Sequence, residues 1–78
     1  MKRLSAMQNF IQNLIRIRKD RGLTQTDVAE LIGTKQSAIS RLERGEEDIT
    51  LSRAETICAA LDVELSEMVL SPELSKIT

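Results

Sequence analysis

The stretch TQTDVAELIGTKQSAISRLERG, residues 24–45, decides the fold of this chain. Its apolar residues recur at the three- and four-residue spacing of amphipathic helices, and Gly33 interrupts that pattern once. Thr24, followed three residues later by Asp27, can cap the start of one helix, and Thr34 can cap the start of the next. The stretch therefore predicts two short helices that pack at a steep angle across a tight connection, which is a helix-turn-helix.

The second of these helices, residues 35–44, has two chemically different faces. At about 100° per residue, polar and cationic side chains collect on one side and apolar side chains on the other. The polar face holds Gln36, Ser37, Ser40, Arg41 and Arg44, and the apolar face holds Ala38, Ile39 and Leu42. Glutamine matches the hydrogen-bonding edge of adenine, arginine matches that of guanine, and serine reaches bases or phosphates. Such a face can read DNA, although every soluble helix has some polar face.

The flanking residues predict three further helices. An apolar stripe indicates a first helix over about residues 5–21, and Thr50, or Ser52 in a capping box with Glu55, starts the fourth. A short fifth helix spans about residues 65–70. The fourth helix is expected to be buried through Leu51, Ala54, Ile57 and Leu61.

Length and composition predict a single domain. The chain has 78 residues, of which 41% are hydrophobic and only one, Phe10, is aromatic, so the core must be aliphatic, as in packed helices. We expect an all-α, compact five-helix domain over residues 1–78, with a core of about 10–70 and a loose tail over 71–78.

Several classes of chemistry are excluded by residue counts. The sequence has no histidine and one cysteine, Cys58, so neither a His-based catalytic triad nor the usual zinc site can form. We expect no enzyme activity, no metal and no cofactor. Neither a secretory signal nor a membrane-spanning apolar run is present, which predicts a soluble cytoplasmic protein.

Charge is distributed unevenly along the chain. The net charge is −1, but residues 1–44 hold nine Lys or Arg against four Asp or Glu, a balance of +5. Residues 45–78 hold two bases and eight acids, a balance of −6. A basic half is thus available to face phosphate, although two ordinary solvated surfaces would give the same count.

These residues resemble the helix-turn-helix of the lambda-repressor-like, Xre-type family of regulators. The segment GLTQTDVAELIGTKQSAISRLERG follows the family pattern, and ITLSRAETICAALDVELSEM is similar to the family's fourth and fifth helices. The resemblance covers roughly residues 10–70. It implies a lambda-repressor-like fold and a sequence-specific transcriptional regulator that binds double-stranded DNA.

The resemblance also implies roles for individual residues. Gln25 would bond a phosphate and brace Gln36, and Arg18 would pair with Glu43. Phosphate contacts fix register and base contacts specify sequence. The implied base contacts are Gln36, Ser37, Ser40 and Arg41, and the implied phosphate contacts are Arg18, Gln25, Thr34, Lys35 and Arg44.

Two features depart from the family pattern. The helix over residues 35–44 is the expected recognition helix, the one that enters the major groove. The loop after it carries Glu46, Glu47 and Asp48, where many relatives have basic or neutral residues. Either this loop weakens phosphate binding or it points away from DNA. Asp62 stands where many relatives have glycine, and aspartate tolerates the left-handed backbone that such a turn requires.

The partners expected besides DNA are proteins. A homodimer is predicted through the crowded apolar end of the chain, at Leu65, Met68, Val69 and Leu70, with Leu4 and Met7 as a second candidate surface. Two functional classes remain open. The first is a dimeric repressor or autoregulator of phage, mobile-element or restriction-modification controller type, and the second is an antitoxin that neutralises a toxin partner and regulates its own operon. Glu30 and the acidic loop are candidate contacts for RNA polymerase in an activator.

Overall fold

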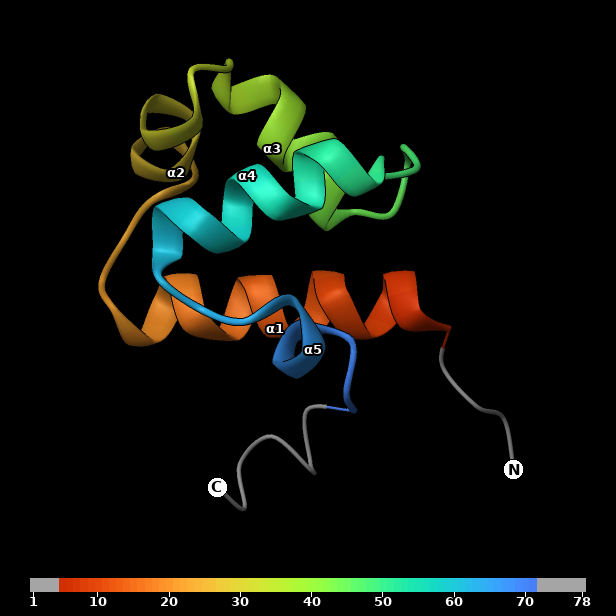
Figure 1. Ribbon diagram of the computed structural model, residues 1–78. Coiled ribbons are helices and arrows are strands. Elements are labelled where there is room, and N and C mark those ends of the chain that lie inside the picture. Colours follow the sequence, from red (N-terminus) through yellow and green to blue (C-terminus); the bar gives the residue numbers. More distant parts are fainter. Residues whose placement is uncertain (1–4, 72–78) are drawn as a thin grey trace.

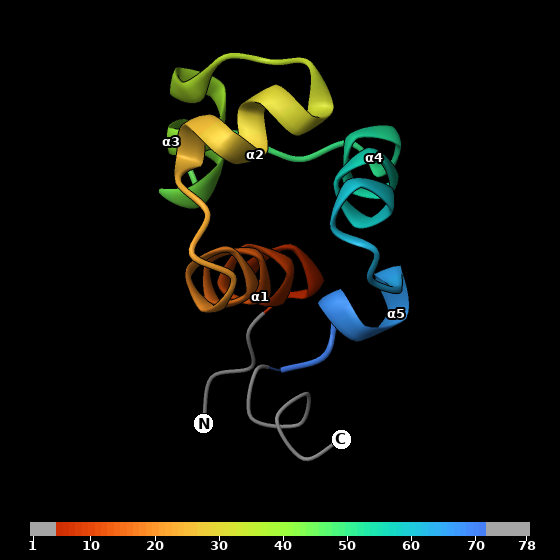
Figure 2. The ribbon, with the colours of Figure 1, turned by 90° about the vertical axis from the view of Figure 1, so that its left-hand side faces the viewer.

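The computed structural model describes residues 5–71, and within that range it contains five α-helices and no strand. They are α1 (Ala6–Asp20), α2 (Gln25–Ile32), α3 (Gln36–Glu43), α4 (Leu51–Leu61) and α5 (Leu65–Met68). Figure 1 shows α1 below α4 and the α2–α3 pair, and Figure 2 shows α4 beside that pair, with α4 and α5 on one side of α1. The predicted five-helix all-α fold is confirmed. No helix in this range combines the length and apolarity that crossing a membrane requires.

Local capping signals set most helix ends. Ser5 and Thr24 each form a capping box at the start of α1 and α2, and Gly33 ends α2 in a left-handed conformation with φ 74°. The prediction that Thr34 caps α3 is wrong. The Thr34 amide donates to Ala29 O at 2.8 Å and so closes the end of α2. The N-cap of α3 is therefore Lys35, one residue later, which makes no side-chain cap hydrogen bond.

The fourth helix begins at Leu51. Thr50 caps it by accepting a hydrogen bond from the Arg53 amide at 3.1 Å, so the alternative capping box at Ser52 does not form. Leu51 is 66% exposed, which corrects its predicted burial: the first turn of α4 borders an open groove instead of another helix. The helix ends at Asp62, whose φ of 56° confirms the predicted left-handed turn.

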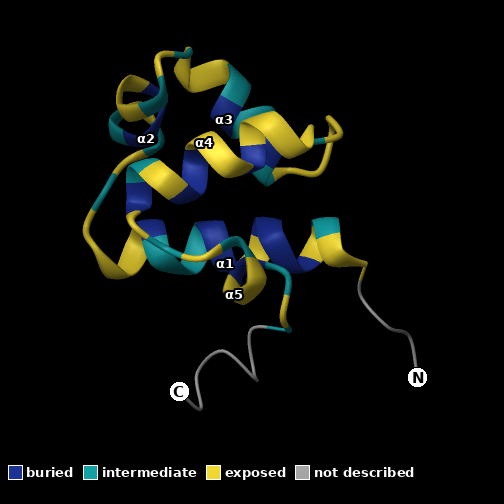
Figure 3. Cartoon of the chain, viewed as in Figure 1, coloured by how far each residue is buried: buried dark blue, intermediate teal, exposed yellow. Residues whose placement is uncertain are grey.

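The core lies between α1, α4 and α5. Its largest fully buried side chains include Phe10, Leu14, Ile57, Leu61 and Met68. A smaller buried cluster of Val28, Ala29 and Ile39 joins α2 to α3. The buried faces of the helices turn toward one another in Figure 3. This second cluster packs one face of α3 against α2. The opposite face of α3 remains accessible to solvent.

Two buried asparagines hold α5 against α1. Asn13 Nδ2 donates to Met68 O and Leu70 O, each at 2.9 Å, and Asn9 Nδ2 donates to Val69 O at 2.9 Å. Carbonyl groups at the end of a helix lack intrahelical partners, so these amides replace missing hydrogen bonds. Asn9 and Asn13 are four residues apart, so both lie on the buried face of α1. A prediction based on the apolar residues alone does not identify these two asparagines as buried.

Cys58 is a buried core thiol. Burial raises its pKa, with a further contribution from the negative charges of Glu64 and Glu55. The thiolate is the form that attacks a disulfide reagent, so both low access and the raised pKa of Cys58 slow the reaction. We expect an aromatic disulfide reagent at pH 7–8 to label the native protein far more slowly than the urea-unfolded chain. Equal rates in the two states would contradict the burial of Cys58.

Candidate nucleic-acid interface

The third helix presents the polar face that its sequence predicts. Gln36 and Ser37 are exposed at its start, and Arg41 is partly exposed one turn further on. On the opposite side Ile39 and Leu42 are buried, at 2% and 6% exposure. The polar and apolar faces of α3 are therefore separate, and the polar face does not take part in the hydrophobic core.

A largely buried ion pair ties α1 to α3. Arg18 Nε donates to Glu43 Oε2 at 2.7 Å and Arg18 Nη2 donates to Glu43 Oε1 at 3.0 Å. The side chains are 11% and 5% exposed. The third guanidinium nitrogen, Nη1, donates to Leu23 O at 3.0 Å. A two-bond pair of this kind fixes both position and orientation, and it is the ion pair that the resemblance implied.

Arg18 is engaged inside the domain, and the phosphate contact implied for it stays a prediction. All three of its guanidinium nitrogens donate to groups inside the protein, and the side chain is mostly covered. Burying a charge of this size requires internal partners, and Glu43 and Leu23 take up three of the five N–H donors of Arg18. The ion pair with Glu43 joins α1 to α3.

The ion pair continues into a chain of hydrogen bonds that reaches the exposed face of α3. Gln25 Nε2 donates to Glu43 Oε1 at 3.0 Å, and Gln36 Nε2 donates to Gln25 Oε1 at 2.6 Å. The predicted bracing of Gln36 by Gln25 is present. The amide of Gln36 keeps one N–H and its oxygen for an outside partner. Its plane is fixed from within the domain before any ligand arrives.

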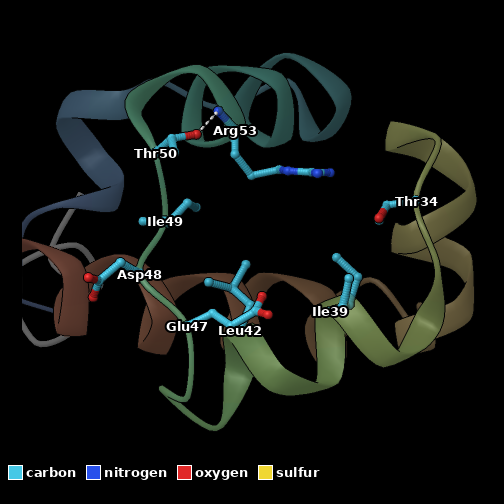
Figure 4. Close-up of a pocket in the computed structure, with 9 residues that line it drawn as sticks. Thr34, Ile39, Leu42, Glu47, Asp48, Ile49, Thr50 and Arg53 are labelled. Carbon is cyan, nitrogen blue, oxygen red and sulfur yellow. Dashed lines mark hydrogen bonds between the residues drawn. The ribbon is translucent and has the colours of Figure 1, made fainter.

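The start of α3 is suited to an anion. Lys35 is exposed and offers no side-chain acceptor to the first amides of the helix, which carry the positive end of the helix dipole. Thr34 is only half-exposed and lines a pocket of about 220 Å³ behind α3. Figure 4 shows Arg53 extending from α4 across this pocket toward Thr34. Lys35 is thus more accessible to phosphate than Thr34.

The acidic loop after α3 folds back onto the helix. Arg41 Nε donates to Glu47 Oε1 at 2.9 Å, and Arg44 Nε donates to Glu46 Oε2 at 2.6 Å. Arg44 Nη1 also donates to the hydroxyl of Ser40. The loop is therefore not bare negative charge, because two of its carboxylates are paired with Arg41 and Arg44.

The predicted dimer residues are placed unequally. Met68 is 1% exposed in the domain's own core, so it is not available to a second protein, and its inclusion in an interface is corrected. Leu70 is 42% exposed. Leu65 and Val69 line an apolar groove of about 270 Å³ together with Met7 and the exposed Leu51. Leu4 lies outside the described residues.

Metal binding finds no support in the described part of the chain, since no three Cys, Asp or Glu side chains within residues 5–71 gather in a way that would hold an ion. Residues 18–47 place amide, hydroxyl and guanidinium groups on the exposed face of α3, and the largely buried Arg18–Glu43 pair supports this helix. Groups of these kinds are the ones that contact bases and phosphates in protein–nucleic acid complexes.

A family model described as helix-turn-helix (HTH_3) matches residues 14–68. No curated protein sequence matches the chain significantly. Among solved structures, a hypothetical transcription factor NHTF from Neisseria is 29% identical, with a TM-score of 0.82 over 92% of this chain and 84% of that one.

Two further solved structures share the fold. The restriction-modification controller protein C.AhdI from Aeromonas hydrophila is 32% identical, with a TM-score of 0.73 over 80% of this chain and 94% of that one. The clp gene regulator ClgR from C. glutamicum, at 24% identity and a TM-score of 0.76 over 87% of each chain, supports the fold alone. With its α2–turn–α3 geometry and the family match over residues 14–68, the chain belongs to the lambda-repressor-like helix-turn-helix family of DNA-binding transcription regulators.

Proposed function

We propose that the protein binds a two-fold symmetric operator as a homodimer, with α3 of each subunit in the major groove, and regulates transcription there as a repressor or autoregulator. The observation that carries the proposal is the chain Arg18–Glu43–Gln25–Gln36, which fixes a glutamine amide on an exposed helix. A preorganised amide recognises adenine with little loss of conformational entropy on binding.

Base contacts are assigned to Gln36, Ser37, Ser40 and Arg41. Phosphate contacts are assigned to four residues: Gln25, which begins α2, Thr34 in the turn, Lys35 at the start of α3, and Arg44 at its end. The similarity to a restriction-modification controller protein favours a small regulator of a neighbouring gene over other uses of the same fold.

The homodimer is assigned to the apolar groove beside α5. The exposed Leu51 lines it together with Met7, Leu65 and Val69, and the exposed Leu70 directly follows Val69 in the chain. Met7, which belongs to the second surface considered from the sequence, lines the same groove as Leu65. A second copy of the chain covers it and places two recognition helices about one DNA turn, roughly 34 Å, apart.

Replacing Leu70 by aspartate tests this surface. Leu70→Asp places a charge in the interface, so we expect the dimer to weaken at least tenfold and the domain to remain folded. Leu31→Asp is the matched control, because Leu31 is 54% exposed on α2, away from the groove. Sedimentation at micromolar concentration, with and without DNA, measures both. Only monomer for the wild type, or equal weakening by both variants, would contradict the assignment.

Selection of bound duplexes from a random DNA pool tests the function itself. Salt near the physiological concentration suppresses binding to phosphate alone. We expect a two-fold symmetric motif with half-sites about one turn apart. Enrichment of no motif would contradict the proposal and would favour the second functional class, an antitoxin-type module whose main partner is a toxin protein.

A further inference from the structure

The two arginines on the recognition helix are held differently by the loop that follows it. Arg41 uses only Nε, which donates to Glu47, and its two terminal nitrogens make no hydrogen bond within residues 5–71. Arg44 uses Nε and Nη2 on Glu46, at 2.6 and 3.3 Å, and Nη1 on Ser40. One arginine therefore has a free end, and the other has every nitrogen engaged.

The free end of Arg41 has the shape needed to bind guanine. A guanidinium reads guanine by donating two parallel hydrogen bonds to O6 and N7. It has two edges that can donate in this way, one formed by Nε with Nη2 and the other by Nη1 with Nη2. Because Glu47 occupies Nε, only the terminal edge remains, and the carboxylate limits rotation of the group. Glu47 thus acts on DNA through Arg41.

Arg44, unlike Arg41, has no guanidinium nitrogen without a hydrogen bond. Its hydrogen bonds with Glu46 and Ser40 must break before a phosphate oxygen can take their place. The hydrogen bond from Arg44 lowers the pKa of Glu46, helped by the positive charges of Arg44 and Arg41 and opposed by desolvation. Glu46 therefore stays ionised at neutral pH, and its pairing with Arg44 is lost only as the pH falls through that lowered pKa.

We propose that the two neighbouring glutamates have opposite effects on DNA recognition: Glu47 positions Arg41 to read a guanine, whereas Glu46 competes with phosphate for Arg44 and lowers affinity for every sequence. This inference rests on the proposed function and deepens it by assigning specificity to a loop residue outside the recognition helix. Simple repulsion between acids and phosphate predicts instead that removing either glutamate has the same result.

The test compares three alanine substitutions in one loop. Glu46→Ala and Glu47→Ala each remove one carboxylate paired with an arginine. Asp48→Ala removes the neighbouring carboxylate, which makes no ion pair among the described residues. All three residues are exposed, so the melting temperature should change little. Affinity is measured for the duplex selected by the wild type and for variants of it with one base pair replaced.

Exposed ion pairs have small effects, so the expected changes are roughly two- to fivefold. Relative to Asp48→Ala, Glu46→Ala should tighten binding to all duplexes alike and steepen the salt dependence by about 0.9 in slope, as one added phosphate contact does. Glu47→Ala should reduce the preference for guanine at one position. In an Arg41→Ala background it should leave base preferences unchanged.

Three outcomes are decisive against the idea. If Glu46→Ala and Glu47→Ala both match Asp48→Ala, or if Glu47→Ala raises affinity with an unaltered guanine preference, the inference fails while the proposed function stands. If the wild type selects no motif, the proposed function fails, and the inference fails with it.

Discussion

Arg18→Met should lower the free energy of unfolding by about 3 kcal/mol. We expect no other substitution proposed for this protein to reduce its stability as much. The substitution leaves the Glu43 carboxylate, whose side chain is 5% exposed, with only the Gln25 amide as a partner. Breaking a buried pair by removing one member typically costs 3–5 kcal/mol, and the remaining amide bond argues for the lower end of that range. Urea unfolding followed by circular dichroism, at a fixed protein concentration, measures it.

The double variant Arg18→Met with Glu43→Leu is the control. Removing both charges removes the unpaired carboxylate, so most of the lost stability should return. The double variant should nevertheless bind DNA less selectively, because Gln25 loses the Glu43 oxygen that orients it. A single variant as stable as the wild type would show that the ion pair does not anchor α3.

Gln36→Ala should weaken binding to the selected duplex by about 1–3 kcal/mol and remove the preference for adenine at one position. The reason is geometric: Gln25 holds one N–H of the Gln36 amide, at a donor–acceptor distance of 2.6 Å, which leaves the other N–H and the oxygen for one base. Equilibrium binding to duplexes with single base-pair changes measures both quantities.

Lys35→Ala provides the comparison, because Lys35 is the neighbouring residue and is expected to contact phosphate. Its loss should weaken all sequences similarly and reduce the salt slope by about 1. If Gln36→Ala also lowered affinity uniformly, with every base preference retained, the assignment of Gln36 as a base contact would be wrong.

Features set by neighbours along the chain were predictable from the sequence. The Thr24–Asp27 capping box, the left-handed turns at Gly33 and Asp62, and the two faces of α3 all depend on residues within one or two turns. Local chemistry fixes such features because the interacting groups are close before the chain folds.

Features set by distant residues were harder to predict. Leu51 shares the periodicity of α4 but lies beyond the end of the core, and Met68 is covered by helices that come together only in the folded domain. Thr34 has the chemistry of a cap, but its amide is used to close α2. The backbone bends after α3, and this bend brings the loop glutamates back to Arg41 and Arg44. The number of charges in the sequence does not predict this pairing.

Chemical-shift mapping of the isotope-labelled protein, titrated with its selected duplex, tests most directly whether α3 is the surface that reads DNA. We predict the largest backbone and side-chain amide changes at Gln36, Ser37 and Arg41, with smaller ones at the start of α2 and little change along the groove lined by Leu65 and Val69. Changes confined to that groove or to α4, with the Gln36 side-chain amide unmoved, would contradict the account.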